Sequence, residues 1–332
     1  MKLLAPDDAR WLELVMARPE ASVFHHPAWA TLLADCYGWR AMLAVSERGG
    51  ALPVIDTSLP LRRRWAALPF TDTCEPLPDA DTAAFADALC GLARHARLDA
   101  VEVRGPLPPC DGVQVASRFV RHEVALAADW RALWRRLRRN HRRNVVDASE
   151  AGLRVERATS ATALETFFDL HVQTRRRLGV PVQPRRFFRL FAERILARGL
   201  GFVLTAYHGS APAAAAVFVA WNGVLVCKYS ARADAHQRSD AIPLLFWTAM
   251  RWACEEGYHA FDLGRTDHDN TTLRSFKSGW GAQEHALAYS WIARRPVRSP
   301  PRRLEAAVSL AIRHSRPWVC RAMGELLYRY AG

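Results

Sequence analysis

Apolar and polar positions alternate along the first third of the chain with two different periods. From Pro27 to Tyr37 apolar residues recur every three or four positions, which predicts an amphipathic helix. The segments Ala41–Ser46 and Ala51–Leu59 are strand-like, and a helix from Asp81 to Arg97 precedes a short strand from Leu98 to Val103. This pattern predicts a mixed α/β domain.

The second half contains a longer series of elements. Asn222-Gly223 separates two apolar runs, which is a strong signal for a hairpin turn. The predicted elements are, in order, the strand Leu153–Glu156, the helices Ala161–Arg177 and Arg185–Arg198, the strands Gly201–Tyr207, Ala213–Trp221 and Val224–Ser230, the helix Pro243–Glu256, and the strands His259–Leu263 and Ala286–Ile292. The second half is therefore also mixed α/β.

The chain is long enough for two domains, since 332 residues suit two cores of ordinary size. A new strand begins after Gly152, so we expect an N-terminal domain over residues 1–150 and a second domain over residues 151–295. Residues 296–332 are expected to form a basic, Pro/Arg-rich linker and an amphipathic helix beyond Pro317. Docking on the protein itself and contact with a membrane surface are both consistent with that helix.

Positive charge dominates the composition, with 46 basic against 33 acidic residues and a formal net charge of +13. Such a chain attracts phosphates, nucleic acid or an anionic membrane surface. Only Lys2, Lys228 and Lys277 are lysines, and the other 43 basic residues are arginines. A GC-rich coding sequence would produce this bias without a physical reason, but a retained lysine offers a compact ammonium that arginine cannot replace.

The segment from Trp130 to Asn144 concentrates this charge. Trp130, Leu133, Trp134 and Leu137 share one face of a predicted helix, and arginines occupy the other faces. A solvated amphipathic helix and a contact with phosphates or nucleic acid are both consistent with the pattern.

The seven cysteines are odd in number and have no CxxC or other zinc-ligand spacing, which favours a reduced, cytoplasmic protein. The chain has no apolar run long enough for a membrane span, and its N-terminus has no apolar core of signal-peptide length. The run Asp267-His268-Asp269 is interpreted as a solvated loop, because adjacent residues rarely converge on one ion. We expect no metal site.

Two motifs near the end of the second half carry a family resemblance. They are Phe261-Asp262-Leu263-Gly264-Arg265 and Phe276-Lys277-Ser278-Gly279-Trp280-Gly281-Ala282. They resemble the FemAB-like branch of the N-acetyltransferase (GNAT) superfamily, and weaker similarities extend over most of the chain up to about Pro296. The resemblance implies two tandem GNAT-like domains that transfer an acyl or aminoacyl group to an amine of a cell-envelope or polysaccharide-related precursor.

Acyl transfer to an amine passes through a tetrahedral oxyanion, which a nearby cation or backbone N–H stabilises. Lys277 can supply the cation, although it could instead be an ordinary surface residue. By the resemblance, the Phe276 N–H is an oxyanion donor beside Lys277. Arg265 and Trp280 are further candidates for substrate binding, and the glycines around Trp280 allow either close approach of a ligand or an ordinary turn.

Candidates of second rank lie elsewhere. Asp72 matches an acidic position that contributes to acceptor binding in the family, where it could take a proton from the amine or simply cap a turn. Four further residues are expected to contact substrate: Thr174, Arg177, Lys228 and Tyr229.

The acyl donor is left open between aminoacyl-tRNA and acyl-CoA. Users of acetyl-CoA bind its diphosphate with a glycine-containing loop at a helix N-terminus. Here that place contains Arg238, a candidate phosphate contact, but also Asp240 and Pro243, of which the second has no N–H. Standard CoA binding is therefore disfavoured.

The expected partners are a small-molecule or lipid-linked amine acceptor and tRNA, with peripheral contact at the inner face of the membrane through the C-terminal tail. Two alternatives stay open: an acyl-CoA-dependent N-acyltransferase, and a non-catalytic basic protein that binds nucleic acid or an anionic membrane.

Overall fold

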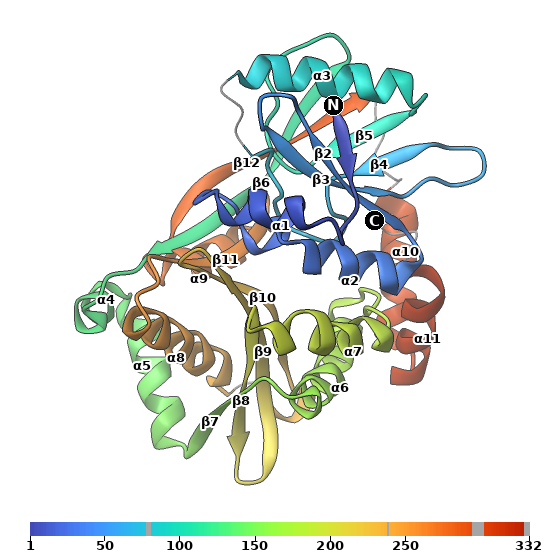
Figure 1. Ribbon diagram of the computed structural model, residues 1–332. Helices are drawn as coiled ribbons and strands as arrows, with labels where there is room; N and C mark the ends of the chain where they lie inside the picture. Colours follow the sequence, from blue (N-terminus) through green and yellow to red (C-terminus); the bar gives the residue numbers. More distant parts are fainter. Residues whose placement is uncertain (78–80, 238, 294–301, 329–332) are drawn as a thin grey trace. The chain divides into compact units, whose positions relative to one another are not determined.

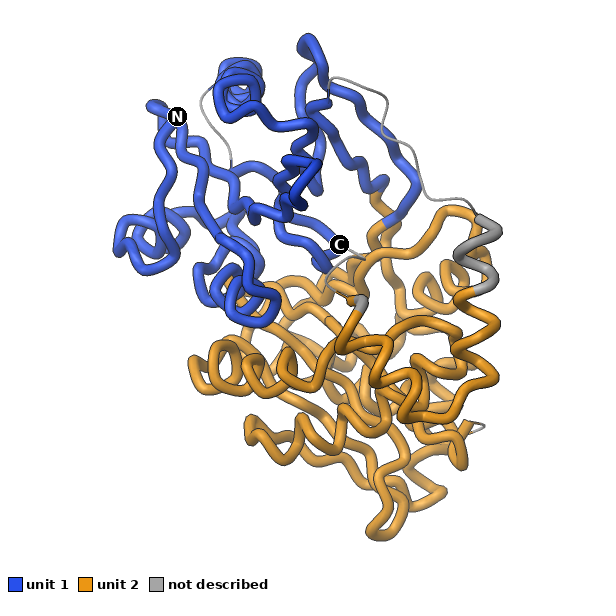
Figure 2. The backbone as a smooth tube through the Cα atoms, turned by 90° about the vertical axis from the view of Figure 1, so that its right-hand side faces the viewer, with its two compact units in different colours: residues 1–120, 286–299, 332 blue, residues 121–285, 300–331 orange. Residues whose placement is uncertain are grey.

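The structure is a computed structural model that describes residues 1–77, 81–237, 239–293 and 302–328. It divides into two compact units (Figure 2): unit 1 combines residues 1–120 with 286–299, and unit 2 combines residues 121–285 with 300–331. These limits differ from the predicted boundary at residue 150, because two arginine-rich helices before that residue pack against helix and strand elements of unit 2.

Within the described residues, unit 1 contains three α-helices and a series of strands that pair with one another. Strand β4 pairs in parallel with β5, and the pairs β1–β2, β2–β3, β3–β4 and β5–β12 are antiparallel. The elements are β1 (Lys2–Leu4), α1 (Ala9–Met16), α2 (Pro27–Tyr37), β2 (Arg40–Val45), β3 (Ala51–Asp56), β4 (Arg64–Ala66), α3 (Thr82–His95), β5 (Ala100–Val103), and the parts of β6 (Val113–Ala125) and β12 (Gln283–Ala293) that belong to this unit.

Unit 2 is built on strands in the order β6-β11-β10-β9-β8-β7 (Figure 1). The pair β10–β11 is parallel, whereas β7–β8, β8–β9 and β9–β10 are antiparallel. Its strands and helices are α4 (Trp130–Arg136), α5 (Arg139–Glu150), β7 (Leu153–Ala158), α6 (Ala161–Leu178), α7 (Arg185–Arg194), β8 (Gly201–His208), β9 (Ala211–Trp221), β10 (Val224–Arg232), α8 (Ala241–Glu255), β11 (Ala260–Asp267), α9 (Thr271–Ser278), α10 (Arg302–His314) and α11 (Pro317–Leu327).

Helices cover both faces of the unit 2 sheet. Ala214, Ala216 and Phe218 on β9 lie in one apolar cluster with residues of α4, α5 and α8. Their neighbours Ala215 and Val217 point to the other face, where α6 contacts β8, β9 and β10, because side chains alternate along a strand. Both faces of β9 are therefore buried.

Local sequence signals explain several boundaries. Ser160 caps α6 by accepting a hydrogen bond from the Ala163 N–H, and Gly179 ends that helix in the left-handed conformation with φ +71°. Asn222 and Gly223 both have positive φ, so the predicted hairpin turn between β9 and β10 is confirmed.

Three features differ from the sequence-based expectation. The predicted helix over Trp130–Asn144 is broken at Leu137 and Arg138, whose ψ angles are extended, because the Arg138 N–H bonds to the Gly279 carbonyl instead of continuing α4. The long strand β6 was not predicted. The segment after Leu263 was expected to be a loop, but β11 continues to Asp267 and α9 follows.

The C-terminal helices pack on their own unit. Both α10 and α11 contact α6, and Ile312 and Cys320 are completely buried. Their outward positions include the exposed side chains of Leu310, Trp318 and Leu326. Most of the predicted linker lies outside the described residues. Within the described part of the chain, no helix combines the length and the apolar character needed to cross a bilayer.

Candidate active site

The two parallel strands of unit 2 pair only over their first three residues and diverge toward their carboxyl ends. Val224 to Val226 on β10 pair with Ala260 to Asp262 on β11, and beyond these residues both strands continue without pairing to each other. A register shift in β10 between Cys227 and Tyr229 leaves Lys228 as an extra residue at the point of separation. Ligands commonly bind where neighbouring parallel strands diverge at their carboxyl ends.

Lys277 holds the diverging end of β11. Its ammonium donates hydrogen bonds to the carbonyls of Gly264, at 2.8 Å, and Arg265, at 2.9 Å, and its side chain is buried. Gly264 has φ +73°, which favours glycine there and turns the backbone toward the lysine. Lys277 is therefore a buried cation fixed to a specific bend of the candidate site.

Asp262 stabilises the same bend from the strand itself. Its carboxylate accepts a hydrogen bond from the Gly264 N–H at 2.7 Å and another from Arg121 Nε at 2.8 Å. Arg121 lies on β6, so the bend is tied to the neighbouring strand as well as to α9.

A charged network lies beside Lys277. His122 is completely buried and donates from Nε2 to Glu284 at 3.0 Å, and Arg274 on α9 pairs with the same carboxylate at 2.7 Å. The hydrogen bonds from Arg274, together with those from His122, lower the pKa of Glu284 to about 2. Burial and the positive charge of Lys277 lower the pKa of His122, so this imidazole is neutral at pH 7.

Phe276 and Trp280 lie in the core beside the lysine. Phe276 is the sixth residue of α9, where helix geometry directs its N–H toward the Thr272 carbonyl. Trp280 is completely buried against His141, Phe246 and Phe276. The structure thus places both side chains in packing positions, and Arg265 is the exposed side chain of this motif.

Thr174 and Arg177 fix the other diverging strand. The Thr174 hydroxyl donates to the Arg232 carbonyl at 3.1 Å and accepts the Arg232 N–H at 3.0 Å, while Arg177 pairs with Asp234 at 2.5 Å. These contacts join α6 to the end of β10. Thr174 therefore positions the backbone at the end of β10, and Arg177 pairs with the side chain of Asp234 just beyond it.

Lys228 and Tyr229 lie between these two regions, on β10. The Lys228 ammonium is 5.4 Å from the centre of the Tyr229 ring, a cation–π distance. Tyr229 also contacts the rings of His171 and Phe188, and burial lowers the pKa of His171 to about 3. The segment is half-buried and carries the most accessible lysine near the strand divergence.

The predicted residues therefore form two neighbouring groups in unit 2 and one outlier. Arg265, Phe276, Lys277 and Trp280 gather at β11 and α9, and the residues of α6 and β10 gather at the other strand end. Asp72 belongs to unit 1, where its carbonyl accepts a hydrogen bond from the Tyr289 hydroxyl at 2.6 Å. Arg238 lies outside the described residues.

Sequence reasoning missed Arg121, His122 and Glu284, because their only signal is spatial: β6 brings the first two beside a motif that lies about 140 residues later. The described residues contain no group of histidine, cysteine and acidic side chains that could hold a metal ion.

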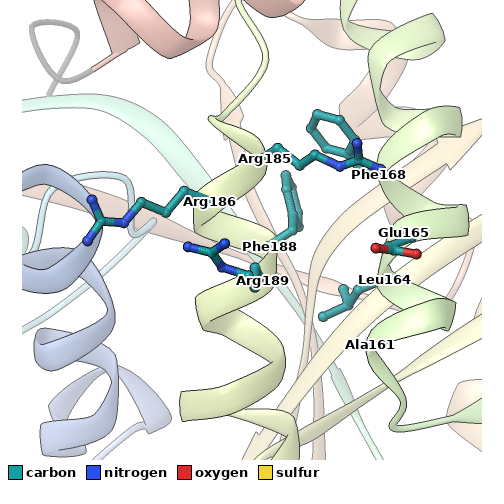
Figure 3. A pocket seen from close by; sticks show the side chains of 8 residues that line it. All are labelled: Ala161, Leu164, Glu165, Phe168, Arg185, Arg186, Phe188 and Arg189. Carbon is teal, nitrogen blue, oxygen red and sulfur yellow. The ribbon is translucent and has the colours of Figure 1, made fainter.

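A separate pocket of about 290 Å³ lies between α6 and α7 (Figure 3). Leu164, Phe168 and Phe188 supply its apolar walls, and the exposed side chains of α7 at its rim are Arg185, Arg186 and Arg189. It is a second basic surface of unit 2.

The diverging strands β10 and β11 and the helix α8 between them lie within one segment of the chain that has a recognisable sequence profile. Residues 135–278 match the sequence profile of the family described as acetyltransferase (GNAT) domain, and this part of the chain is such a domain. No curated protein matches the sequence.

Solved structures share the fold over nearly the whole chain. A structure of FemX has a TM-score of 0.70 at 14% identity, covering 93% of this chain and 100% of FemX. The C-terminal domain of a putative lysylphosphatidylglycerol synthetase from Agrobacterium fabrum has a TM-score of 0.58 at 15% identity, covering 92% and 94%. A tandem GNAT protein from the clavulanic acid biosynthesis pathway has a TM-score of 0.51 at 14% identity, covering 87% and 97%. The predicted fold class of tandem GNAT-like domains is confirmed.

Proposed function

We propose that this acyltransferase moves an aminoacyl group from aminoacyl-tRNA to an amine of a cell-envelope precursor. The choice of donor depends on one observation, the start of α8. In this fold that helix begins where the diphosphate of a CoA donor would need backbone N–H groups.

The first turn of α8 is unsuited to a diphosphate. Ala241 and Pro243 are buried, and Pro243 has no N–H to offer. Asp240 precedes them, and burial and the nearby Asp147 carboxylate raise its pKa, which means that the site disfavours negative charge. The diphosphate of a CoA donor would bring further negative charge close to the Asp240 and Asp147 carboxylates, which would repel it.

The proposed reaction balances without a cofactor. The acceptor amine attacks the ester carbonyl of the donor, the tetrahedral oxyanion collapses, and the ribose oxygen leaves and takes up the proton that the amine loses. Lys277 contributes a fixed positive charge at the β11 bend, and its hydrogen bonds to Gly264 and Arg265 keep that bend rigid. We assign Lys228 and Tyr229 to substrate contacts at the separation of the strands.

The proposed acceptor is a small-molecule or lipid-linked amine. One neighbour in fold supports a lipid-linked acceptor by its name, a putative lysylphosphatidylglycerol synthetase, which is named for a lipid that carries an amino acid. A cytoplasmic enzyme of this kind would meet lipid-linked acceptors at the inner face of the membrane. The exposed Leu310, Trp318 and Leu326 of α10 and α11 suit such peripheral contact.

The test is a donor competition. The purified protein is incubated with a membrane-precursor extract and either radiolabelled aminoacyl-tRNA or radiolabelled acetyl-CoA, and label in the acceptor fraction is counted. We expect label to be transferred from aminoacyl-tRNA. In Lys277→Met the rate of transfer should fall at least about 100-fold, as it does when one oxyanion-stabilising group is removed from an enzyme. Lys2→Met, at an exposed lysine of unit 1, is the matched control.

Because Lys277 is buried, its variant is also examined by thermal unfolding, and Arg265→Ala provides a second variant at an exposed position of the same motif. Transfer from acetyl-CoA, with none from aminoacyl-tRNA, would contradict the proposal and favour the CoA-dependent alternative.

A further inference from the structure

Seven arginines lie on α4, on α5 and at the break between these two helices. Six of the seven are exposed, and none of them has a buried carboxylate partner. We call this the α4–α5 arginine surface; its members are Arg131, Arg135, Arg136, Arg138, Arg139, Arg142 and Arg143.

Acidic side chains neutralise little of this charge. Arg135 approaches Asp129 at 3.8 Å and Arg143 approaches Asp147 at 3.7 Å, and all four side chains are more than half exposed. Exposed pairs of this kind contribute at most about 1 kcal/mol and are screened by salt. Most of the positive charge therefore faces solvent.

The start of α5 adds to the excess of positive over negative charge on these helices. Arg138 is its N-cap and Arg139 its first residue, its first turn has no acidic residue, and the Arg138 side chain makes no capping hydrogen bond. Cations near a helix N-terminus are unfavourable by about 0.3–1 kcal/mol each, because the helix dipole is positive there. The arrangement becomes favourable when a polyanion lies across it.

The arginine surface is also joined to the candidate active site. The Arg138 N–H donates to the Gly279 carbonyl at 3.0 Å, and its guanidinium donates to the carbonyl and the hydroxyl of Ser275, both at 3.2 Å. His141 Nε2 donates to the Phe276 carbonyl at 2.8 Å. The first turn of α5 is thus fastened to α9, the helix that carries Lys277.

The chemistry of the surface fits nucleic acid better than a bilayer. Between Asp129 and Glu150 Val146 is the single exposed large apolar side chain, which is too little apolar surface for insertion into a membrane. Guanidinium groups bind phosphates with two parallel hydrogen bonds and stack on bases. The partly buried Trp130 ring lies at cation–π distances of 4.5 Å from Arg131 and 4.8 Å from Arg251.

We propose that the α4–α5 arginine surface binds the RNA of the aminoacyl donor and thereby brings its aminoacyl end beside α9. The proposal rests on the proposed function for the identity of the RNA. Binding itself is measurable without transfer.

The test uses the full-length protein and a fluorescently labelled, deacylated tRNA, with anisotropy recorded over a range of KCl concentrations. The variant replaces Arg135, Arg136, Arg139 and Arg143 with Gln. We expect a loss of affinity of at least about tenfold at 0.1 M salt, and a reduction of about 3 in the slope of log K against log salt, because four phosphate contacts are lost.

The matched control removes the same charge elsewhere in unit 2, by replacing three arginines at the α6–α7 pocket, Arg185, Arg186 and Arg189, and also Arg198, with Gln. These arginines are also exposed. The control is expected to change affinity by less than about threefold. Equal losses in both variants, or no loss in the first, would overturn the proposal.

Two further measurements separate the alternatives. If the α4–α5 variant loses binding to phosphatidylglycerol vesicles but keeps binding to tRNA, the surface is a membrane contact and the proposal fails. In the transfer assay we expect the KM for aminoacyl-tRNA to rise at least about tenfold with kcat nearly unchanged, since RNA contacts act on binding.

The two proposals fail in different ways. Transfer from aminoacyl-tRNA with an unchanged KM in the variant would refute the RNA surface and leave the function intact. Specific tRNA binding together with exclusive use of acetyl-CoA would refute the donor assignment and leave the surface intact.

Discussion

The first turns of α5 and α8 have opposite charge although the two helices pack against each other in unit 2. Helix α5 begins at Arg139 after Arg138, and both arginines are exposed, whereas α8 begins after Asp240 with a first turn that includes the buried Ala241 and Pro243. A helix dipole favours anions at both starts to the same degree. Accessibility and neighbouring side chains therefore decide which start is suited to an anion.

This difference bears on how one GNAT domain selects its donor. A donor held by a short diphosphate needs free N–H groups and no nearby carboxylate, which the start of α8 does not offer. A donor held by a long polyanion needs many exposed cations, which α4 and α5 supply. The exposed start of α5 is therefore suited to a polyanionic donor, and the buried start of α8 is unsuited to a donor that is held by its diphosphate.

The largest expected effect comes from Gly279→Ala, at the junction of α5 and α9. An added Cβ would lie 2.7 Å from both Cε1 and Nε2 of His141, an imidazole held by its bond to Phe276. Overpacking of this kind costs about 1–3 kcal/mol. We expect lower stability in urea unfolding and a loss of transfer that exceeds any loss of tRNA binding, since the arginines remain.

Gly91→Ala is the control for this substitution, because Gly91 is in α3 and an added Cβ would meet no atom within 4 Å apart from its chain neighbours and the backbone of its own helix. It should raise stability by about 0.5–1 kcal/mol. Unchanged stability in Gly279→Ala would mean that the α5–α9 junction is looser than these distances imply.

A smaller effect is expected from Arg139→Glu, which gives the start of α5 the charge sign found at the start of α8. The acidic side chain suits the helix dipole, so stability should stay equal or rise by about 0.3–1 kcal/mol. Affinity for tRNA should fall by about tenfold at 0.1 M salt, because one phosphate contact becomes a repulsion. Thermal unfolding and anisotropy measure the two opposite changes.

Arg139→Gln should lie between wild type and Arg139→Glu in tRNA affinity. A parallel loss of stability and affinity in Arg139→Glu would indicate that the arginine is structural, contrary to the comparison.

Much of the fold could be predicted from the sequence where apolar periodicity follows burial. Helix α2 has the predicted limits Pro27 and Tyr37, and the Asn222-Gly223 turn joins β9 and β10 as expected. Strand β6 escaped prediction because its inward positions include His122, whose burial depends on the distant Glu284 and Arg274. Local alternation of apolar and polar residues cannot reveal such a strand.

The candidate site could be predicted from the sequence only in part. Scarcity of lysine pointed to Lys277, but its partners are the carbonyls of Gly264 and Arg265, which no residue pattern encodes. The break between α4 and α5 likewise depends on the Gly279 carbonyl, 141 residues beyond Arg138 in the sequence. The sequence identified the residue types of the site, whereas the contacts that orient them needed the fold.

The smallest effect is expected from Asp240→Asn, which removes the acid at the start of α8. Burial and the Asp147 carboxylate raise the pKa of Asp240 above 3.8, its ordinary value, so folding disfavours its ionised form. The stability that the protonated acid contributes is therefore present below pH 3.8 and is lost as pH rises through the folded pKa. Asn has no such loss, so the variant should be more stable than wild type by about 0.5 kcal/mol at pH 7, and the two should converge as pH falls below 3.8.

The same variant sharpens the comparison of the two helix starts. Calorimetry with acetyl-CoA should detect no tighter binding than in wild type, because Pro243 still lacks an N–H and Ala241 is still buried. Micromolar binding of acetyl-CoA by Asp240→Asn would mean that one carboxylate, rather than the buried backbone of the first turn, closes α8 to a diphosphate, and the contrast with α5 would then reduce to a single charge.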